Sequence, residues 1–176
     1  MAERQRHGFD FQKKMCSEKN LKESSEYIGR WDAFDSNNYP CVIKTFKKGS
    51  EIPLSDIFIN SSRNENFRMI FGIWSGSKTN IVEVFDVMID YKKFTKLFEF
   101  QSYKELKIWI KNVSNDRSYD KIWKQECQMW KTKWGKTRLV QPRFKRDHKS
   151  QKRIQSAVSY KNIQRFIEVV GYSKIV

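Results

Sequence analysis

Apolar residues recur along this chain at two different spacings, and each spacing predicts a different kind of element. Residues 2–19 place Phe11 and Met15 four positions apart among charged neighbours, which predicts a helix. Two apolar runs follow at residues 27–35 and 39–47, separated by a short polar turn, and they predict a pair of strands. We therefore expect a first helix that leads into a β-hairpin.

The middle of the chain continues the strand pattern. Residues 67–74 and 81–89 are further apolar runs with a glycine-containing turn between them, so we predict a sheet of at least four strands. Between the two pairs, residues 52–57 predict a short helix, because Pro53 is well accepted in a first helical turn. Residues 61–66 are polar and predict a loop.

From Tyr91 onward the apolar residues lie three and four positions apart, which is the spacing of helices. One such stripe consists of Trp123, Cys127, Trp130 and Trp134. Because this stripe keeps a helical spacing, we interpret it as core packing rather than as a surface on which nucleic-acid bases stack. Residues 138–146 and 152–158 then predict two basic strands, and residues 160–169 predict a final helix.

This order of elements, a helix, a sheet, helices, two strands and a helix, is typical of a mixed α/β or α+β fold. The 176 residues are 39% hydrophobic and 15% aromatic, which excludes a wholly disordered chain. The sequence contains no repeat and no evident linker. We therefore expect residues 1–176 to form a single domain with a sizeable core.

No run approaches the roughly eighteen apolar residues that a membrane span needs, and the N-terminus is charged where a secretory signal has an apolar core. Cys16, Cys41 and Cys127 are odd in number and widely spaced, so neither a disulfide framework nor a zinc site is indicated. Glycine-rich phosphate-binding motifs and the nucleophile elbow of serine hydrolases are also missing from the sequence. These features predict an intracellular protein that is not secreted.

The net charge of +15 is concentrated in the last third of the chain. Residues 121–176 hold 15 lysines and arginines against 3 acidic residues, whereas residues 1–60 hold 10 against 9 and residues 61–120 hold 10 against 8. Such asymmetry predicts a polyanionic partner, for which nucleic acid ranks ahead of an acidic membrane surface. Charge that serves only solubility is the alternative, but it would be spread more evenly.

The basic residues are densest in the region of about residues 136–155. A loop and strands of this composition can follow a phosphate backbone, while glutamines among them can reach base edges. We expect contacts with double-stranded DNA from Arg138, Arg143, Lys145, Arg146, Lys149, Lys152, Arg153 and Gln155. A solvated basic hairpin and an RNA target are the alternatives at this point.

Two charged residues lie within the apolar pair of strands. Asp32 belongs to the first run and Lys44 to the second. Burying an unpaired ion costs several kcal/mol, so charges at such positions are usually paired or functional. The structural alternatives are a solvated aspartate at a strand end and a lysine that extends from an edge strand into water.

The segments Trp31-Asp32 and Val42-Ile43-Lys44 resemble the motif of the PD-(D/E)XK superfamily, the fold of many type II restriction endonucleases. Asp32 matches the first acidic residue of that motif, and Lys44 matches its lysine. The resemblance implies a restriction-endonuclease-like fold, in which a central mixed β-sheet is flanked by helices. It also implies that Asp32 holds Mg²⁺, with Mn²⁺ as a substitute, and that Lys44 orients or activates the attacking water.

The chain departs from this motif at Val42, where the family has glutamate or aspartate. Because a valine side chain cannot bind a metal, either the backbone carbonyl of Val42 or a carboxylate from elsewhere would have to serve as the second ligand. Glu26 is the first candidate, because it lies just before the segment of Asp32. The other candidates are Asp10, Asp35 and Asp56, with Gln12 as a source of a neutral oxygen.

The residues and the resemblance together predict a Mg²⁺-dependent endodeoxyribonuclease that hydrolyses phosphodiester bonds in double-stranded DNA, sequence-specifically as restriction enzymes do. A palindromic target would imply a two-fold symmetric homodimer. Three alternatives remain. They are a homing or repair nuclease on the same scaffold, a DNA-binding protein that has lost its metal ligand and does not cut, and a basic RNA-binding protein.

Overall fold

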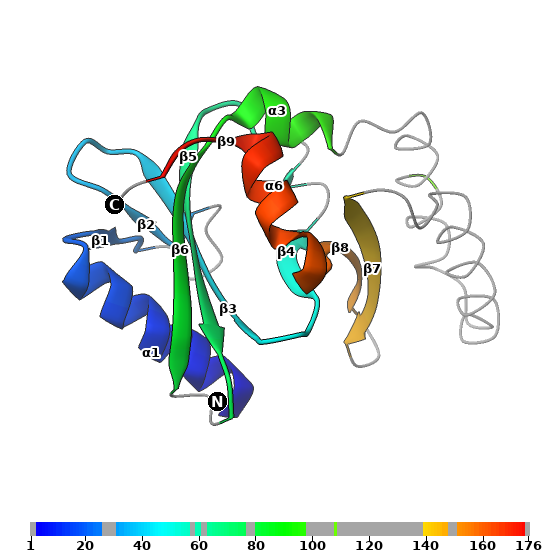
Figure 1. Cartoon of the computed structure of the whole chain (residues 1–176), viewed down its shortest axis with the longest axis horizontal. Coiled ribbons are helices and arrows are strands. Elements are labelled where there is room, and N and C mark those ends of the chain that lie inside the picture. Colours follow the sequence, from blue (N-terminus) through cyan, green and yellow to red (C-terminus); the bar gives the residue numbers. More distant parts are fainter. Residues whose placement is uncertain are drawn as a thin grey trace.

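The computed structural model describes residues 3–25, 31–56, 59–60, 63–76, 80–97, 108, 139–147 and 151–174. These residues form three layers with a mixed β-sheet in the middle (Figure 1). Helix α1 (Glu3–Glu18) covers one face of the sheet. The other face is covered by α6 (Ile163–Val170), α3 (Tyr91–Lys96) and a second, smaller sheet.

The central sheet has six strands in the order β1-β2-β3-β5-β6-β9. Their bounds are β1 Lys22–Glu23, β2 Ala33–Phe34, β3 Pro40–Lys47, β5 Phe67–Trp74, β6 Ile81–Ile89 and β9 Gly171–Lys174. Strands β3 and β5 run parallel, and the other neighbouring pairs are antiparallel. The three longest strands of this mixed sheet, β3, β5 and β6, therefore lie side by side.

The second sheet has the order β4-β8-β7 and is antiparallel throughout. Its strands are β4 Ile52–Asp56, β7 Val140–Asp147 and β8 Gln151–Val158. A single turn, η2 (Tyr160–Asn162), connects β8 to α6. Figure 1 shows this sheet on the same side of the central sheet as α6. The two basic strands predicted from the sequence thus belong to a separate sheet.

The smaller hydrophobic core lies between α1 and the central sheet. Phe11 and Met15 of the helix pack with Cys41 and Ile43 of β3. Phe11 lies directly over Gly72 of β5, where a β-carbon would be 2.4 Å from the phenylalanine ring. Glycine in a strand commonly marks such a close approach. The absence of a side chain at this position therefore lets α1 lie close to the sheet.

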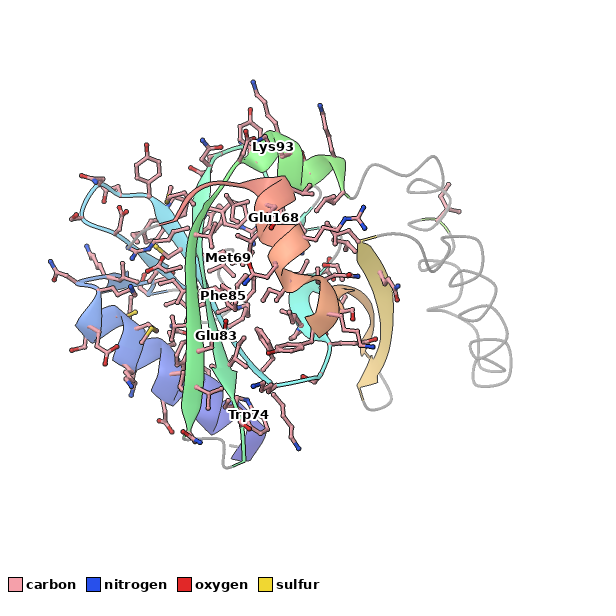
Figure 2. The ribbon with its side chains drawn as sticks, viewed as in Figure 1. Met69, Trp74, Glu83, Phe85, Lys93 and Glu168 are labelled. Carbon is pink, nitrogen blue, oxygen red and sulfur yellow. The ribbon has the colours of Figure 1, made fainter. Side chains whose placement is uncertain are left out.

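The larger core lies on the opposite face, where the central sheet packs against α3, α6 and the second sheet. Figure 2 shows Met69 and Phe85 on the side of the sheet that faces α6. Phe94 of α3 makes edge contacts with Phe67 and Phe166, with ring centroids 5.2 Å and 6.3 Å apart. Because each fully buried side chain of this size stabilises the fold by about 1.5–3 kcal/mol, these rings hold the outer layer on the sheet.

The structure confirms the mixed α/β class and most of the predicted elements. Helix α1, strands β3, β5 and β6, and helix α6 fall on the segments predicted for them, and β7 and β8 match the two basic strands closely. The polar turn between the first two runs joins β2 to β3, as predicted. Long elements with one or two buried faces carry a strong periodic signal, which explains why these were found.

One prediction of local structure was wrong, and another is described only in part. The segment predicted as a helix at 52–57 forms strand β4, in which Pro53 is tolerated because β4 is an edge strand with β8 as its neighbour. The run predicted as a strand at 27–35 is described from Trp31 onward, where the strand is β2 and Asp32 lies just before it. Strands β1 and β9 are short and were not predicted. The tryptophan-rich stripe, 123–134, lies outside the described residues.

Candidate active site

Asp32 and Lys44, the two charged residues of the motif, lie in contact. Nζ of Lys44 is 2.7 Å from Oδ2 of Asp32, which is hydrogen-bond distance. Both side chains are 25% exposed, so the pair is neither fully solvated nor enclosed in the core. The fold thus brings together two residues that are 12 positions apart in the sequence.

The carboxylate of Asp32 takes the place of a strand partner along β3. Strand β2 pairs with β3 through Ala33 and Phe34, and Asp32 extends this pairing by donating its N–H to the carbonyl of Cys41 at 2.9 Å. Two residues further along β3, on the same edge of the strand, the N–H of Ile43 donates to Oδ2 of Asp32 at 2.7 Å. An edge N–H thereby acquires a charged acceptor, which makes a strong hydrogen bond. The end of β2 therefore sets the position of the carboxylate.

The backbone carbonyl of Asp32 is held by two other segments. It accepts hydrogen bonds from the N–H of Ser24 at 3.1 Å and from Nε2 of Gln12 at 3.4 Å. Within the part of the chain that the structure describes, Oδ1 of Asp32 accepts no hydrogen bond. Oδ2 is therefore bonded to Ile43 and Lys44, whereas no described residue donates a hydrogen bond to Oδ1.

Oδ1 of Asp32, which no described residue bonds, fits the divalent cation that the resemblance implies. Mg²⁺ prefers oxygen ligands and is often held by one or two carboxylates together with substrate phosphates. Gln12 brings an amide group to the same residue. No group of three or more His, Cys, Asp and Glu side chains able to hold a metal occurs among the described residues. Among the described residues, a metal held here would therefore depend on Asp32, together with oxygens of the substrate.

The backbone of Val42, the candidate second ligand, is directed away from Asp32. Its side chain is buried in the larger core. The carbonyl of Cys41 and the N–H of Ile43 both bond to Asp32. Because alternate residues of a strand direct their backbone groups to opposite neighbours, the carbonyl of Val42 is directed toward β5. The next carbonyl on the edge beside Asp32 is that of Ile43.

The other candidates for a second carboxylate lie in different places. Glu26, the first candidate, is outside the described residues. Asp10 is exposed on α1. Asp35 accepts two backbone N–H groups of the turn between β2 and β3, both at 2.9 Å, so its Oδ1 is used to close that turn. Asp56 lies at the end of β4, in the second sheet. Among these described residues, none is bonded to Asp32 or Lys44.

The basic region predicted to bind DNA falls largely on the hairpin of β7 and β8. Arg143, Lys145 and Arg146 lie on β7, Lys152, Arg153 and Gln155 lie on β8, and Arg138 and Lys149 are outside the described residues. In the ladder, Lys145 is opposite Arg153, and Arg146 is opposite Lys152. Like charges at directly opposite positions destabilise an antiparallel pair. The register thus places basic residues of β7 opposite basic residues of β8.

The hairpin and the Asp32–Lys44 pair lie on the same side of the central sheet. Lys44 shares a face of β3 with Val42 and Phe46, because alternate side chains of a strand point the same way. Val42 and Phe46 belong to the same core as Val140 of β7 and Val158 of β8. The face of β3 that carries Lys44 is therefore the face on which the basic sheet packs.

A hollow of about 600 Å³ lies next to the segment that contains Asp32. Its lining includes Trp31, which precedes Asp32, Ser24, which bonds the Asp32 carbonyl, and Phe34 of β2. Aromatic rings beside a few polar groups are typical of ligand sites. The molecule thus has open space next to the segment that carries the carboxylate.

A second charged cluster, which the sequence pattern did not indicate, lies on the α1 face of the sheet. Nε and Nη2 of Arg68 donate to the two carboxylate oxygens of Asp86, both at 2.7 Å, and Nζ of Lys19 lies 2.6 Å from Oδ2 of Asp86. Burial raises the pKa of the Asp86 carboxyl, but the hydrogen bonds from Arg68 and Lys19 outweigh it and hold the pKa below its ordinary value. The sequence signal that could have indicated this cluster was a basic residue, Arg68, in one apolar run and an acidic residue, Asp86, in the next run.

The two described cysteines are unsuited to nucleophilic catalysis at neutral pH. Both Cys16 and Cys41 are buried free thiols. Burial raises the pKa of Cys41 to about 12 and that of Cys16 to about 11. Because the thiolate is the reactive form, these side chains stay protonated and unreactive near pH 7.

No known protein family matches this sequence, and neither a curated protein nor a solved structure shows significant similarity to it. In the described part of the chain, no helix combines the length and the apolar character needed to cross a bilayer. A functional assignment therefore depends on the chemistry of the site and of the basic hairpin.

Proposed function

We propose that this protein is a Mg²⁺-dependent endodeoxyribonuclease of the restriction-endonuclease type that cuts double-stranded DNA. The observation that carries the proposal is the 2.7 Å contact between Nζ of Lys44 and Oδ2 of Asp32. Phosphodiester hydrolysis needs a metal ligand and a cationic donor close together, because charge develops on the phosphate while water attacks. The partly exposed pair offers both groups beside strand β3.

Each residue of the pair has a distinct part in this proposal. Asp32 holds the metal through Oδ1, the oxygen that accepts no hydrogen bond from the described residues, while Oδ2 stays bonded to Ile43. A bound Mg²⁺ supplies Lewis-acid stabilisation of the phosphate and of the leaving oxygen. Lys44 donates a hydrogen bond to the attacking water and stabilises negative charge on the phosphate. Any second carboxylate has to come from outside the described residues, for which Glu26 is the candidate.

Double-stranded DNA is the proposed substrate because the basic hairpin lies on the same side of the sheet as the pair. Five basic residues on β7 and β8 can neutralise phosphates, which gives affinity that decreases steeply with salt. Arginine and glutamine on the same strands can read guanine and adenine edges. A palindromic target would require two copies related by a two-fold axis, so the active form is proposed to be a homodimer.

The direct test is cleavage of supercoiled plasmid and of a mixed set of duplexes in Mg²⁺, in Mn²⁺ and in EDTA. We expect discrete fragments that require the metal, and a loss of at least roughly 100-fold in rate for both Lys44→Ala and Asp32→Asn. Lys47→Ala is the matched control, because Lys47 is an exposed lysine on the same strand whose Nζ lies 5.9 Å from the centre of the Trp74 ring. Equal rates for Lys44→Ala and the control would refute the role of Lys44.

A second candidate function is DNA binding without cleavage. The observation that favours it is the position of Val42, whose side chain is buried in the core where the motif has a metal ligand. Such a protein would bind duplex DNA in a salt-sensitive way and leave it intact in both Mg²⁺ and Mn²⁺. A preference for structured RNA over duplex DNA in a competition assay would instead indicate an RNA-binding protein.

A further inference from the structure

Arg63 is a buried arginine that lies against the residue preceding Asp32. The residue is 4% exposed, and the central carbon of its guanidinium is 4.1 Å from the centre of the Trp31 ring and 4.6 Å from that of Phe67. The two rings are themselves 5.4 Å apart. A planar guanidinium stacks well on aromatic faces, which a lysine ammonium cannot do in the same way. Arg63 therefore fixes the orientation of Trp31.

The same arginine is connected to the second sheet by hydrogen bonds. Nε of Arg63 donates to Oδ1 of Asn60 at 3.3 Å. Nδ2 of Asn60 donates to the carbonyl of Leu54 on β4 at 2.5 Å and to Oγ of Ser156 on β8 at 2.9 Å. Asn60 and Ser156 are fully buried, so these bonds form in surroundings that exclude water. The connection therefore runs from the basic hairpin to the aromatic pair at the site.

We propose that Arg63 is a positioning residue that holds Asp32 through Trp31 and links the position of Asp32 to the basic hairpin through Asn60 and Ser156. This inference rests on the proposed function for its meaning, because it couples the binding of DNA at β7 and β8 to the position of the carboxylate that the free protein already holds on Ile43 and Lys44. Arg63 itself does not touch the substrate. Its contribution is to orientation, to which catalysis is sensitive even over small displacements.

The amide signal of Ile43 reports on the site without any need for catalysis. The N–H of Ile43 donates to Oδ2 of Asp32 at 2.7 Å, so its proton chemical shift depends on the position of that carboxylate. In the free protein, we expect Arg63→Lys and Ser156→Ala to shift this signal. Ile163→Val is the matched control, because Ile163 is buried in the same core on α6 and forms no side-chain hydrogen bond.

Measuring kcat and Kd separately distinguishes an effect on the position of Asp32 from an effect on DNA binding. For Arg63→Lys we expect kcat for duplex cleavage to fall roughly tenfold, while the Kd for duplex DNA in EDTA stays within about twofold of that of the natural protein. Ser156→Ala should show the same pattern with a smaller change. A merely structural role would lower the melting temperature but would leave kcat unchanged below that temperature.

The amide-shift measurement and the kinetic measurement together distinguish a failure of this inference from a failure of the proposed function. If the Ile43 signal in Arg63→Lys and Ser156→Ala moves no more than in Ile163→Val, the link is refuted, whether or not the protein cuts DNA. If the signal moves but no duplex is cut in Mg²⁺ or Mn²⁺, the link stands and the nuclease proposal fails. An Arg63→Lys protein with unchanged kcat in an active enzyme would also refute the positioning role.

Discussion

Two carboxylates of this protein have cationic partners at the same distance, and their surroundings differ. Asp86 is bonded through both oxygens to Arg68 at 2.7 Å and also to Lys19, with side-chain exposures of 8% for Arg68 and 6% for Asp86. Asp32 is bonded to Lys44 at 2.7 Å, with both side chains 25% exposed. Both aspartates lie in or beside apolar runs, so the sequence pattern alone does not separate them.

The two carboxylates differ in how many of their oxygens already accept hydrogen bonds. Both oxygens of Asp86 are used by protein donors, as expected for a structural ion pair that is out of reach of solvent. Asp32 uses Oδ2 for Ile43 and Lys44, and Oδ1 has no hydrogen-bond donor among the described residues. A charged pair becomes a candidate for chemistry when one atom stays accessible and unsaturated, rather than because it lies in a strand.

The largest effect on stability is expected at the buried pair. Replacing Arg68 by methionine leaves a buried carboxylate with Lys19 as its remaining cationic partner, and breaking such a pair typically costs about 3–5 kcal/mol. We expect Arg68→Met to lower the free energy of unfolding in urea by an amount in this range. Arg68→Lys, which keeps the charge but loses the two parallel bonds, should cost less. A change below about 1 kcal/mol in Arg68→Met would show that the pair is not structural.

The pH dependence of stability should also originate at the buried pair. The folded state holds the pKa of Asp86 below its ordinary value of 3.8, so the folded protein releases this proton more readily than the unfolded chain. The resulting stabilisation is complete above the unfolded pKa and is lost as the pH falls through the folded pKa.

Urea unfolding at pH 6 and at pH 3 checks this expectation. The natural protein should lose more free energy of unfolding between these two pH values than Asp86→Asn does, because the variant lacks the titrating group. Asp10→Asn serves as the control, since Asp10 is exposed on α1. Parallel loss in all three proteins would show that the acid sensitivity lies elsewhere.

The smallest effect on stability is expected at the candidate site. Partly exposed ion pairs contribute about 0–1 kcal/mol, so Lys44→Met should leave the free energy of unfolding within about 1 kcal/mol of that of the natural protein. If the proposed function is correct, Lys44→Met should also abolish cleavage of duplex DNA. A loss of stability as large as that of Arg68→Met would instead show that Asp32 and Lys44 form a second structural pair and would remove the contrast between the two.

Periodicity was enough to find the long elements but not the short or irregular ones. Helix α1 and strands β3, β5 and β6 bury a regular set of apolar residues, so their spacing carries the signal. Strand β4 was predicted as a helix because Pro53 suits both a first helical turn and an edge strand. Its pairing with β8, about 100 residues later in the chain, decides between the two, and no local pattern contains that information.

Sequence alone nominated Asp32 and Lys44, by their charge within apolar runs and by the resemblance of their spacing to a nuclease motif. The distance between them, the hydrogen bond from Ile43 and the lack of a donor to Oδ1 of Asp32 among the described residues came only from the tertiary structure. So did the direction of the Val42 carbonyl, which depends on which neighbour each residue of β3 faces. The link through Arg63 joins segments 96 residues apart at Asn60 and Ser156. Residue type and spacing are local properties, whereas contact and availability depend on how distant segments pack.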